Sequence, residues 1–163
     1  MEVSLVKTDL SHAPIIHEMQ IKAFKSLLVI YQDYETSPGS ETVERIISRM
    51  NQSFTAYYII HYSDIPVGAI RIVTKDNHIY RVSPIFIVPE YQGRGIAQKV
   101  FEIIEMMHSD AKVWELDTIM QERGNCYLYE KVGYKRTGKE QVINDKMTIV
   151  YYEKHLNRSH GLS

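Results

Sequence analysis

A glycine-rich stretch in the middle of the chain combines residue types and spacing that suit the binding of a phosphate group. From Val88 to Ala97 it reads VPEYQGRGIA, where a predicted strand ends and a predicted helix begins. Gly93 and Gly95 permit a tight turn, and the first N–H groups of the following helix have no partner within that helix. These donors, the positive end of the helix dipole and the guanidinium of Arg94 all favour an anion. The stretch therefore predicts a pyrophosphate site, and the plain alternative is a surface turn with a solvated arginine.

Two familiar nucleotide-binding motifs fit this stretch poorly. A Walker A loop needs a Gly-Lys-Ser/Thr end at a fixed distance from its first glycine, and the segment from Gly93 to Lys99 does not supply one. A Rossmann fingerprint needs a third glycine where this chain has Gln98, although Asp117 ends the next strand about where a ribose-binding acid would fall. The strands that precede the glycines also disfavour this motif. A nucleotide-binding oxidoreductase is therefore the weaker alternative.

Hydrophobic periodicity places the glycines inside one mixed α/β domain that covers residues 1–155. After a first strand and two helices, three strands with short connections form an antiparallel meander that leads into the glycines. We expect the polar tail, residues 156–163, to fray. The expected strands cover residues 3–6, 56–62, 67–73, 79–88, 112–118 and 146–152, and the expected helices begin at the caps Ser11 and Ser40, near Gly95 and near Glu122.

Pro84 interrupts the long strand that runs into the glycines. A proline has no N–H to donate to a neighbouring strand, so inside a strand it usually marks a bulge or a break in the pairing. We therefore expect the sheet to be irregular at Pro84.

Two motifs give the chain a resemblance to a known family. The segment Gln92–Ala97 matches the pattern R/Q-x-x-G-x-G/A, and Leu128–Tyr134 resembles L-Y-x-K-x-G-F/Y. Both are signatures of the GNAT superfamily of acyl-CoA-dependent N-acyltransferases, and here they occur in that family's order with a strand between them. The predicted order β-α-α-β-β-β-α-β-α-β-β also resembles the family's order over nearly the whole chain. The resemblance implies an α/β fold with a mixed, mostly antiparallel central sheet, a splayed central strand and flanking helices.

The resemblance also implies where the acyl donor, acetyl-CoA, would bind. Its pantetheine would pair with the backbone of the strand before the loop, and the N–H of Ile87 would polarise the thioester carbonyl, as an oxyanion hole does. The pyrophosphate would rest on backbone N–H groups of the loop and helix start. The implied donor-binding residues are Ile85, Phe86, Ile87, Gln92, Gly93, Arg94, Gly95, Ile96, Ala97 and Gln98.

Tyr129 falls on the tyrosine of the second motif. By resemblance it protonates the departing CoA thiolate as a general acid, while the plain alternative is a packed tyrosine on a half-buried helix. This segment departs from many relatives, because Glu122 and Asn125 stand where those proteins have asparagine and alanine. We expect Asn125 to contact the pantetheine or to cap a helix that starts later.

The acceptor side is less defined by the sequence. In the family, the loop between the first two helices borders the acceptor, and here Tyr31, Asp33 and Tyr34 would suit a cationic amine, although a solvated polar loop is an equal alternative. Many relatives use a carboxylate as the base, but no acid occurs between Asn77 and Ser83. His78, Tyr80 and Asp117 are candidates for the base by location only.

Composition limits the remaining classes of function. Nineteen Lys and Arg oppose twenty Asp and Glu, which disfavours a nucleic-acid partner or an anionic membrane. Apolar runs are too short to span a bilayer, and no His/Cys spacing suggests a metal site. The lone Cys126 favours a reducing compartment, and we expect a cytoplasmic protein. Dimers are common in the family, so a homodimer is one assembly that the resemblance allows.

Together these observations predict an N-acetyltransferase that moves the acetyl group of acetyl-CoA to a primary amine of a small molecule or peptide. The transfer would be direct, in a ternary complex and without an acyl-enzyme. The alternative outside enzymology is a module that binds acyl-CoA without turnover.

Overall fold

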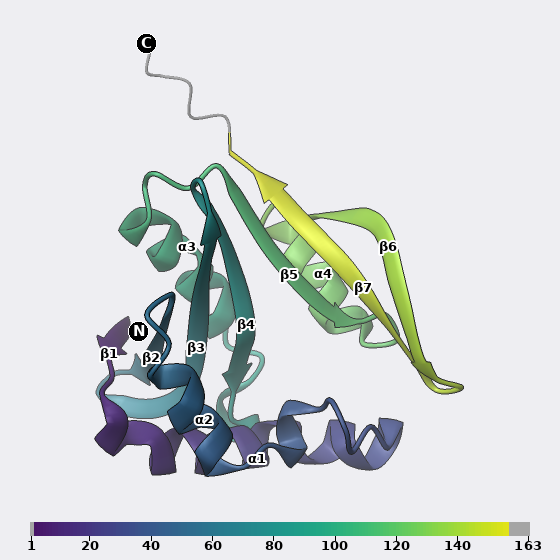
Figure 1. Ribbon diagram of the computed structural model, residues 1–163, viewed down its shortest axis with the longest axis horizontal. Helices are drawn as coiled ribbons and strands as arrows, with labels where there is room; N and C mark the ends of the chain where they lie inside the picture. Colours follow the sequence, from purple (N-terminus) through teal and green to yellow (C-terminus); the bar gives the residue numbers. More distant parts are fainter. Residues whose placement is uncertain (1, 157–163) are drawn as a thin grey trace.

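A computed structural model describes residues 2–156 and gives the order of the elements. The strand β1 leads into two helices and a three-strand meander, and then helices and strands alternate until a final hairpin (Figure 1). The tail expected to fray lies, beyond Leu156, outside the described residues. The elements are β1 (Val3–Lys7), α1 (Ala13–Tyr31), α2 (Val43–Met50), β2 (Thr55–Tyr62), β3 (Ile65–Asp76), β4 (Ile79–Ile87), α3 (Ile96–Met107), β5 (Val113–Ile119), α4 (Arg123–Lys131), β6 (Lys135–Asn144) and β7 (Met147–His155).

The strands form one seven-stranded sheet in the order β1-β2-β3-β4-β5-β7-β6. Every neighbouring pair is antiparallel except β4 and β5, which the helix α3 connects as a parallel crossover. Helices α1 and α2 contact β2, β3 and β4, while α3 packs on β1 and β4 and α4 packs on β5. This mostly antiparallel α/β sheet with flanking helices confirms the expected fold class.

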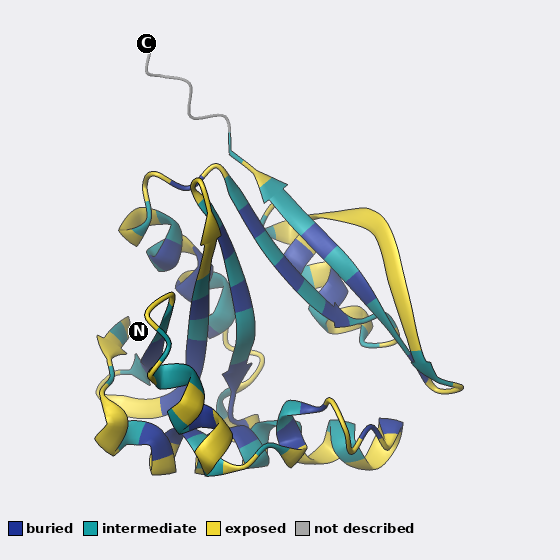
Figure 2. Cartoon of the chain, viewed as in Figure 1, coloured by how far each residue is buried: buried dark blue, intermediate teal, exposed yellow. Residues whose placement is uncertain are grey.

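Burial follows the position of each strand in the sheet (Figure 2). In β5 every second residue is buried, because one face of the strand meets the core: Trp114, Leu116 and Thr118. The edge strand β6 is exposed along most of its length, and charged residues at its start protect the open edge from pairing. None of the helices in residues 2–156 has the length and apolar character needed to cross a bilayer.

Two predicted helix caps were wrong. Thr42, rather than Ser40, caps α2 by accepting a hydrogen bond from the N–H of Arg45 at 3.2 Å. Ser40 belongs instead to a short 3₁₀ turn before the helix. At the start of α1, Ser11 likewise lies inside a 3₁₀ turn, whose cap is Asp9. In both places a short 3₁₀ turn precedes the α-helix, and the predicted serine lies in that turn instead of capping the helix.

The sheet opens between β4 and β5. On one side of β4, Ile85 lies opposite Ile70 but Val82 lies opposite Ile72, so that Ser83 and Pro84 share a single partner position on β3. This is the bulge predicted from Pro84. On the other side, β4 pairs with β5 only from Ile79 to Arg81. Beyond this point the two strands separate, as Figure 1 shows, and the opening confirms the expected splayed strand.

Candidate functional site

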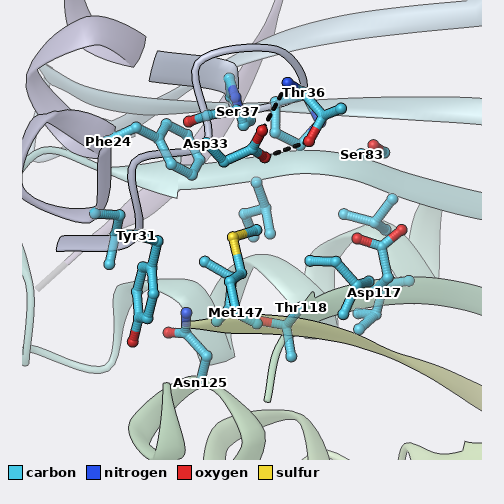
Figure 3. Close-up of a pocket in the computed structure, with 18 of the residues that line it drawn as sticks. Phe24, Tyr31, Asp33, Thr36, Ser37, Ser83, Asp117, Thr118, Asn125 and Met147 are labelled. Carbon is cyan, nitrogen blue, oxygen red and sulfur yellow. Dashed lines mark hydrogen bonds between the residues drawn. The ribbon is translucent and has the colours of Figure 1, made fainter. Parts of the chain in front are cut away.

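A cavity of about 330 Å³ occupies the opening between β4 and β5. Its walls are Val82–Ile85 of β4 and Leu116–Ile119 of β5, and α1 with the loop after it closes one side (Figure 3). Asn125 and Tyr129 of α4, together with residues of β6 and β7, line the other side. The cavity therefore lies where the sheet has lost its strand pairing, and backbone groups as well as side chains face it.

Tyr129 is buried at this cavity, with 8% of its surface exposed. Its ring makes edge contacts with Phe101, Tyr134 and Tyr152, at centroid distances of 5.8, 6.4 and 6.1 Å. Burial raises the pKa of Tyr129 far above its ordinary value, and the charge of Asp117 raises it further. The phenol is therefore protonated at neutral pH and can act as a proton donor.

The end of β4 turns backbone N–H groups toward the opening. The N–H of Val88 donates to the carbonyl of Val67 at 2.8 Å, so Val88 points its backbone groups toward β3. Because this direction alternates along an antiparallel strand, Ile87 and Ile85 point theirs away from β3, to the side where β5 has separated. An extended ligand can take the place of the missing strand there.

The glycine-rich loop has the conformation that the sequence predicted. Gly93 and Gly95 have φ values of +77° and +78°, in the left-handed region that glycine adopts without strain. No side chain caps α3, and its first backbone bond joins the N–H of Lys99 to the carbonyl of Gly95 at 3.2 Å. The N–H groups of Ile96, Ala97 and Gln98 therefore lie before the first bond of the helix and can receive an anion.

Gln92 and Arg94 play more local parts in this loop. The N–H of Gln92 donates to the carbonyl of Pro89 at 3.3 Å, so this one of the expected donors already has a partner. The side-chain amide of Gln92 donates to the carbonyl of Ile87 at 2.8 Å and joins the loop to the end of β4. The guanidinium of Arg94 lies 4.9 Å from the ring centroid of Tyr91, which holds its charge beside the loop.

The three residues expected at the acceptor have different positions. Tyr31 and Asp33 line the cavity, whereas Tyr34 is 63% exposed and is not part of its wall. The Tyr31 hydroxyl donates to Glu122 at 2.5 Å, and burial together with this carboxylate raises the pKa of Tyr31 to about 12. Asp33 accepts hydrogen bonds from the N–H and the hydroxyl of Thr36.

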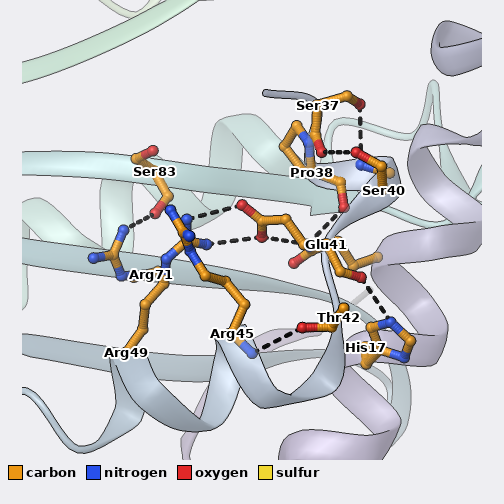
Figure 4. A network of polar contacts seen from close by, with 12 residues as sticks. His17, Ser37, Pro38, Ser40, Glu41, Thr42, Arg45, Arg49, Arg71 and Ser83 are labelled. Atoms are coloured by element: carbon orange, nitrogen blue, oxygen red, sulfur yellow. Dashed lines mark hydrogen bonds and ion pairs between the residues drawn. The ribbon is translucent and has the colours of Figure 1, made fainter. Parts of the chain in front are cut away.

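A pair of charged side chains at the cavity was not predicted from the sequence. Glu41 and Arg49 both line it, and they form a two-bond ion pair with distances of 2.8 Å (Figure 4). Gln20 also donates to Glu41. Arg71 lies nearby and donates to the carbonyl of Ser83 at the β4 bulge. These residues belong to different elements, and no local motif marks them.

The candidates for a base also differ in position. His78 and Tyr80 both contact Asp110, at 2.9 and 3.0 Å, and neither lines the cavity. Asp117 does line it, and it forms an ion pair with Arg81 of β4. Among residues 2–156, no group of three His, Cys, Asp or Glu side chains could hold a metal ion.

Comparison with known proteins gives a family match and several similar structures. A family model described as an acetyltransferase (GNAT) domain matches residues 27–156. An acetyltransferase from Thermus thermophilus superposes with a TM-score of 0.74 at 15% identity, covering 96% of this chain and 98% of that one. The PaiA N-acetyltransferase of Thermoplasma acidophilum, in complex with coenzyme A, gives a TM-score of 0.75 at 14% identity over 96% and 100% of the two chains.

A third similar structure is the spermidine N-acetyltransferase of Vibrio cholerae in complex with CoA and spermine. Its TM-score is 0.74 at 12% identity, with 94% of this chain and 95% of that one covered. The search of curated protein sequences found no significant match. The similar structures therefore support the fold, and the family model supports the assignment to a family.

Proposed function

Because this chain belongs to the GNAT family of acetyltransferases, we propose that it moves the acetyl group of acetyl-CoA directly to a primary amine. The donor supplies an activated acetyl thioester, and the acceptor is an amine of a small molecule or peptide. The observation that carries the proposal is the opening between β4 and β5, where free backbone groups, a protonated tyrosine and a cavity come together.

The residues fit the acyl donor at both of its ends. Gly93 and Gly95 have open space where a Cβ would lie, and the N–H groups at the start of α3 suit a pyrophosphate. Phe86 turns its backbone toward β3 and is not a donor-binding group, whereas the backbone N–H groups of Ile85 and Ile87 on either side of it face the opening and suit the pantetheine. Asn125 lines the cavity next to it, as a side chain that contacts the pantetheine would.

Each proposed catalytic group has a defined task. The N–H of Ile87 points toward the opening and polarises the carbonyl of the thioester, because a fixed donor stabilises charge that develops on that oxygen. Tyr129 holds a proton until the thiolate leaves, and it then donates that proton. The phenol is protonated at neutral pH, as an ordinary tyrosine is, and its burial raises the pKa further, so the proton stays on Tyr129 until the thiolate forms.

The acceptor class rests on the acidic and aromatic residues at the cavity. Tyr31 and Asp33 provide an aromatic face and a negative charge that suit a cationic amine. Proteins of similar fold act on amine acceptors. One is a spermidine N-acetyltransferase, and another, from Salmonella typhimurium, modifies the N-terminal serine of ribosomal protein L7/L12. The unpaired, buried Cys126 fits a reducing compartment, so we place the enzyme in the cytoplasm.

Thermal unfolding and an assay of thiol release test this function. At a concentration 100 times its Kd, acetyl-CoA should stabilise the protein by about 2.7 kcal/mol, and NAD should not. Thiol should then be released with at least one amine in a panel of polyamines, amino acids and peptides with free N-termini. Stabilisation by acetyl-CoA without thiol release across the panel would favour a non-catalytic module, and stabilisation by NAD alone would exclude acetyl transfer.

A further inference from the structure

An acetyltransferase that acts on an alkylamine needs a group that removes a proton from the acceptor. An alkylammonium has a pKa of about 10, so at neutral pH nearly all of the acceptor is charged and its nitrogen has no free electron pair. We infer that the carboxylate of Asp117 is this general base, an inference that rests on the proposed function. The family motifs do not supply it, because no acid occurs between Asn77 and Ser83.

Three carboxylates line the cavity, and in two of them both oxygens already accept hydrogen bonds from the protein. Asp33 accepts from the N–H of Thr36 with one oxygen and from its hydroxyl with the other. Glu41 accepts from Arg49 with both oxygens. Each group is thus committed to holding its own part of the α1–α2 region.

Asp117 is the third, and it keeps one oxygen free. Arg81 binds its Oδ2, while Oδ1 has no hydrogen-bond partner within the described part of the chain. The side chain is 30% exposed, so the acceptor or one water can reach it. In Figure 3 it lies on the β5 wall of the cavity, below Ser83 of β4.

The place of Asp117 along β5 also suits this task. Glu115 is the last β5 residue that pairs with β4, and Asp117 comes two residues later on the same face of the strand, where the opening begins. The charge of Asp117 acts on the phenol of Tyr129. The proposed base and the proposed acid both line this one cavity.

The protons balance with these two groups. Asp117 takes one proton from the ammonium nitrogen and later passes it to solvent. The freed electron pair forms the new C–N bond, the C–S bond breaks, and Tyr129 gives its phenolic proton to the leaving sulfur. The nitrogen then returns its extra proton to Tyr129. An ammonium and an acetyl thioester have become an acetamide, a thiol and one released proton.

The test compares acceptors that need a base with acceptors that do not. In Asp117→Asn, kcat/KM for an alkylamine at neutral pH should fall about 100- to 1,000-fold. For an arylamine, which is uncharged at neutral pH, the loss should be less than about tenfold, because no proton must be removed before attack. Asp117→Thr, whose β-branched side chain suits a strand, should give the same pattern. Both variants should keep the thermal stabilisation by acetyl-CoA.

Asp110→Asn is the matched control, because Asp110 is a carboxylate that binds His78 and Tyr80 outside the cavity. It should keep wild-type rates with both amines. Equal losses for the two amines in the Asp117 variants, unchanged rates, or loss of acetyl-CoA binding would each overturn the inference. If the wild-type protein releases no thiol with any amine, the proposed function fails instead, and the two failures are thus distinguishable.

Discussion

The two ends of the β4–β5 pair differ although they belong to the same strands. At the start of β4, Ile79–Arg81 pairs with β5, and the fully buried Trp114 stacks on Tyr80 at 5.1 Å. At the other end the strands separate, and polar side chains line a cavity. One end gains stability from pairing and aromatic packing, and the other leaves backbone groups free for a ligand. The comparison suggests that stability and function can be changed separately along one strand.

A substitution at the paired end should give the largest effect, and it should lower stability without changing acetyl-CoA binding. Trp114→Ala removes a fully buried aromatic side chain, so the free energy of unfolding should fall by about 3–5 kcal/mol. Urea denaturation measures this loss, and Trp114→Phe should lose less. The folded fraction should still be stabilised by acetyl-CoA. A folded Trp114→Ala protein that no longer binds acetyl-CoA would contradict the separation of the two ends.

At the open end, the next largest effect should be on catalysis alone. Tyr129→Phe keeps the ring contacts but removes the proposed proton donor, so kcat should fall about 100- to 1,000-fold while acetyl-CoA affinity stays the same. Tyr134→Phe is the control, because the buried hydroxyl of Tyr134 has no hydrogen-bond partner among residues 2–156. Comparable kcat values for the two variants would remove the assignment of Tyr129 as the acid.

A substitution at Gly68 tests whether displacing β4 changes stability and acetyl-CoA binding together. A Cβ on this β3 residue would lie 2.0 Å from the carbonyl oxygen of Phe86, so Gly68→Ala must displace the end of β4. We expect a loss of about 1–3 kcal/mol in stability and about tenfold weaker acetyl-CoA binding. Gly124→Ala, with open space around the new Cβ, should change neither by much. Unchanged acetyl-CoA binding in Gly68→Ala would mean that the backbone of β4 does not hold the donor.

The smallest effect should come from pH at the paired end. Burial lowers the pKa of His108, which packs on Trp114, although Asp110 opposes this shift. The unfolded chain therefore binds a proton more readily than the folded one, and stability should fall as the pH drops below about 6.5. Urea midpoints at several pH values measure this. His108→Gln should lose that part of the pH dependence, and an unchanged profile would contradict the assignment.

Features encoded by neighbouring residues were predictable from the sequence. The conformation of Gly93 and Gly95 depends on residue type and local order, and the bulge depends on Pro84, so both could be recognised locally. The Arg81–Asp117 and Glu41–Arg49 pairs could not, because each joins separate elements and forms only when the chain has folded. The cap of α2 was mispredicted because Ser40 and Thr42 are both good caps, and Ser40 is taken up in the 3₁₀ turn that precedes the helix, which leaves Thr42 as the cap.

The contact from the side chain of Gln92 to the carbonyl of Ile87 links the two ends of the proposed donor site. One end would hold the charged nucleotide part of the donor, and the other would hold the reactive thioester. Because this amide spans the corner between them, a shift of the loop would pull on the carbonyl of Ile87, the residue whose N–H is the proposed donor to the thioester. Binding of the nucleotide part can thereby affect how the thioester part is held. An acyl thioester that lacks the nucleotide should therefore be a poorer donor even where its acyl group is identical.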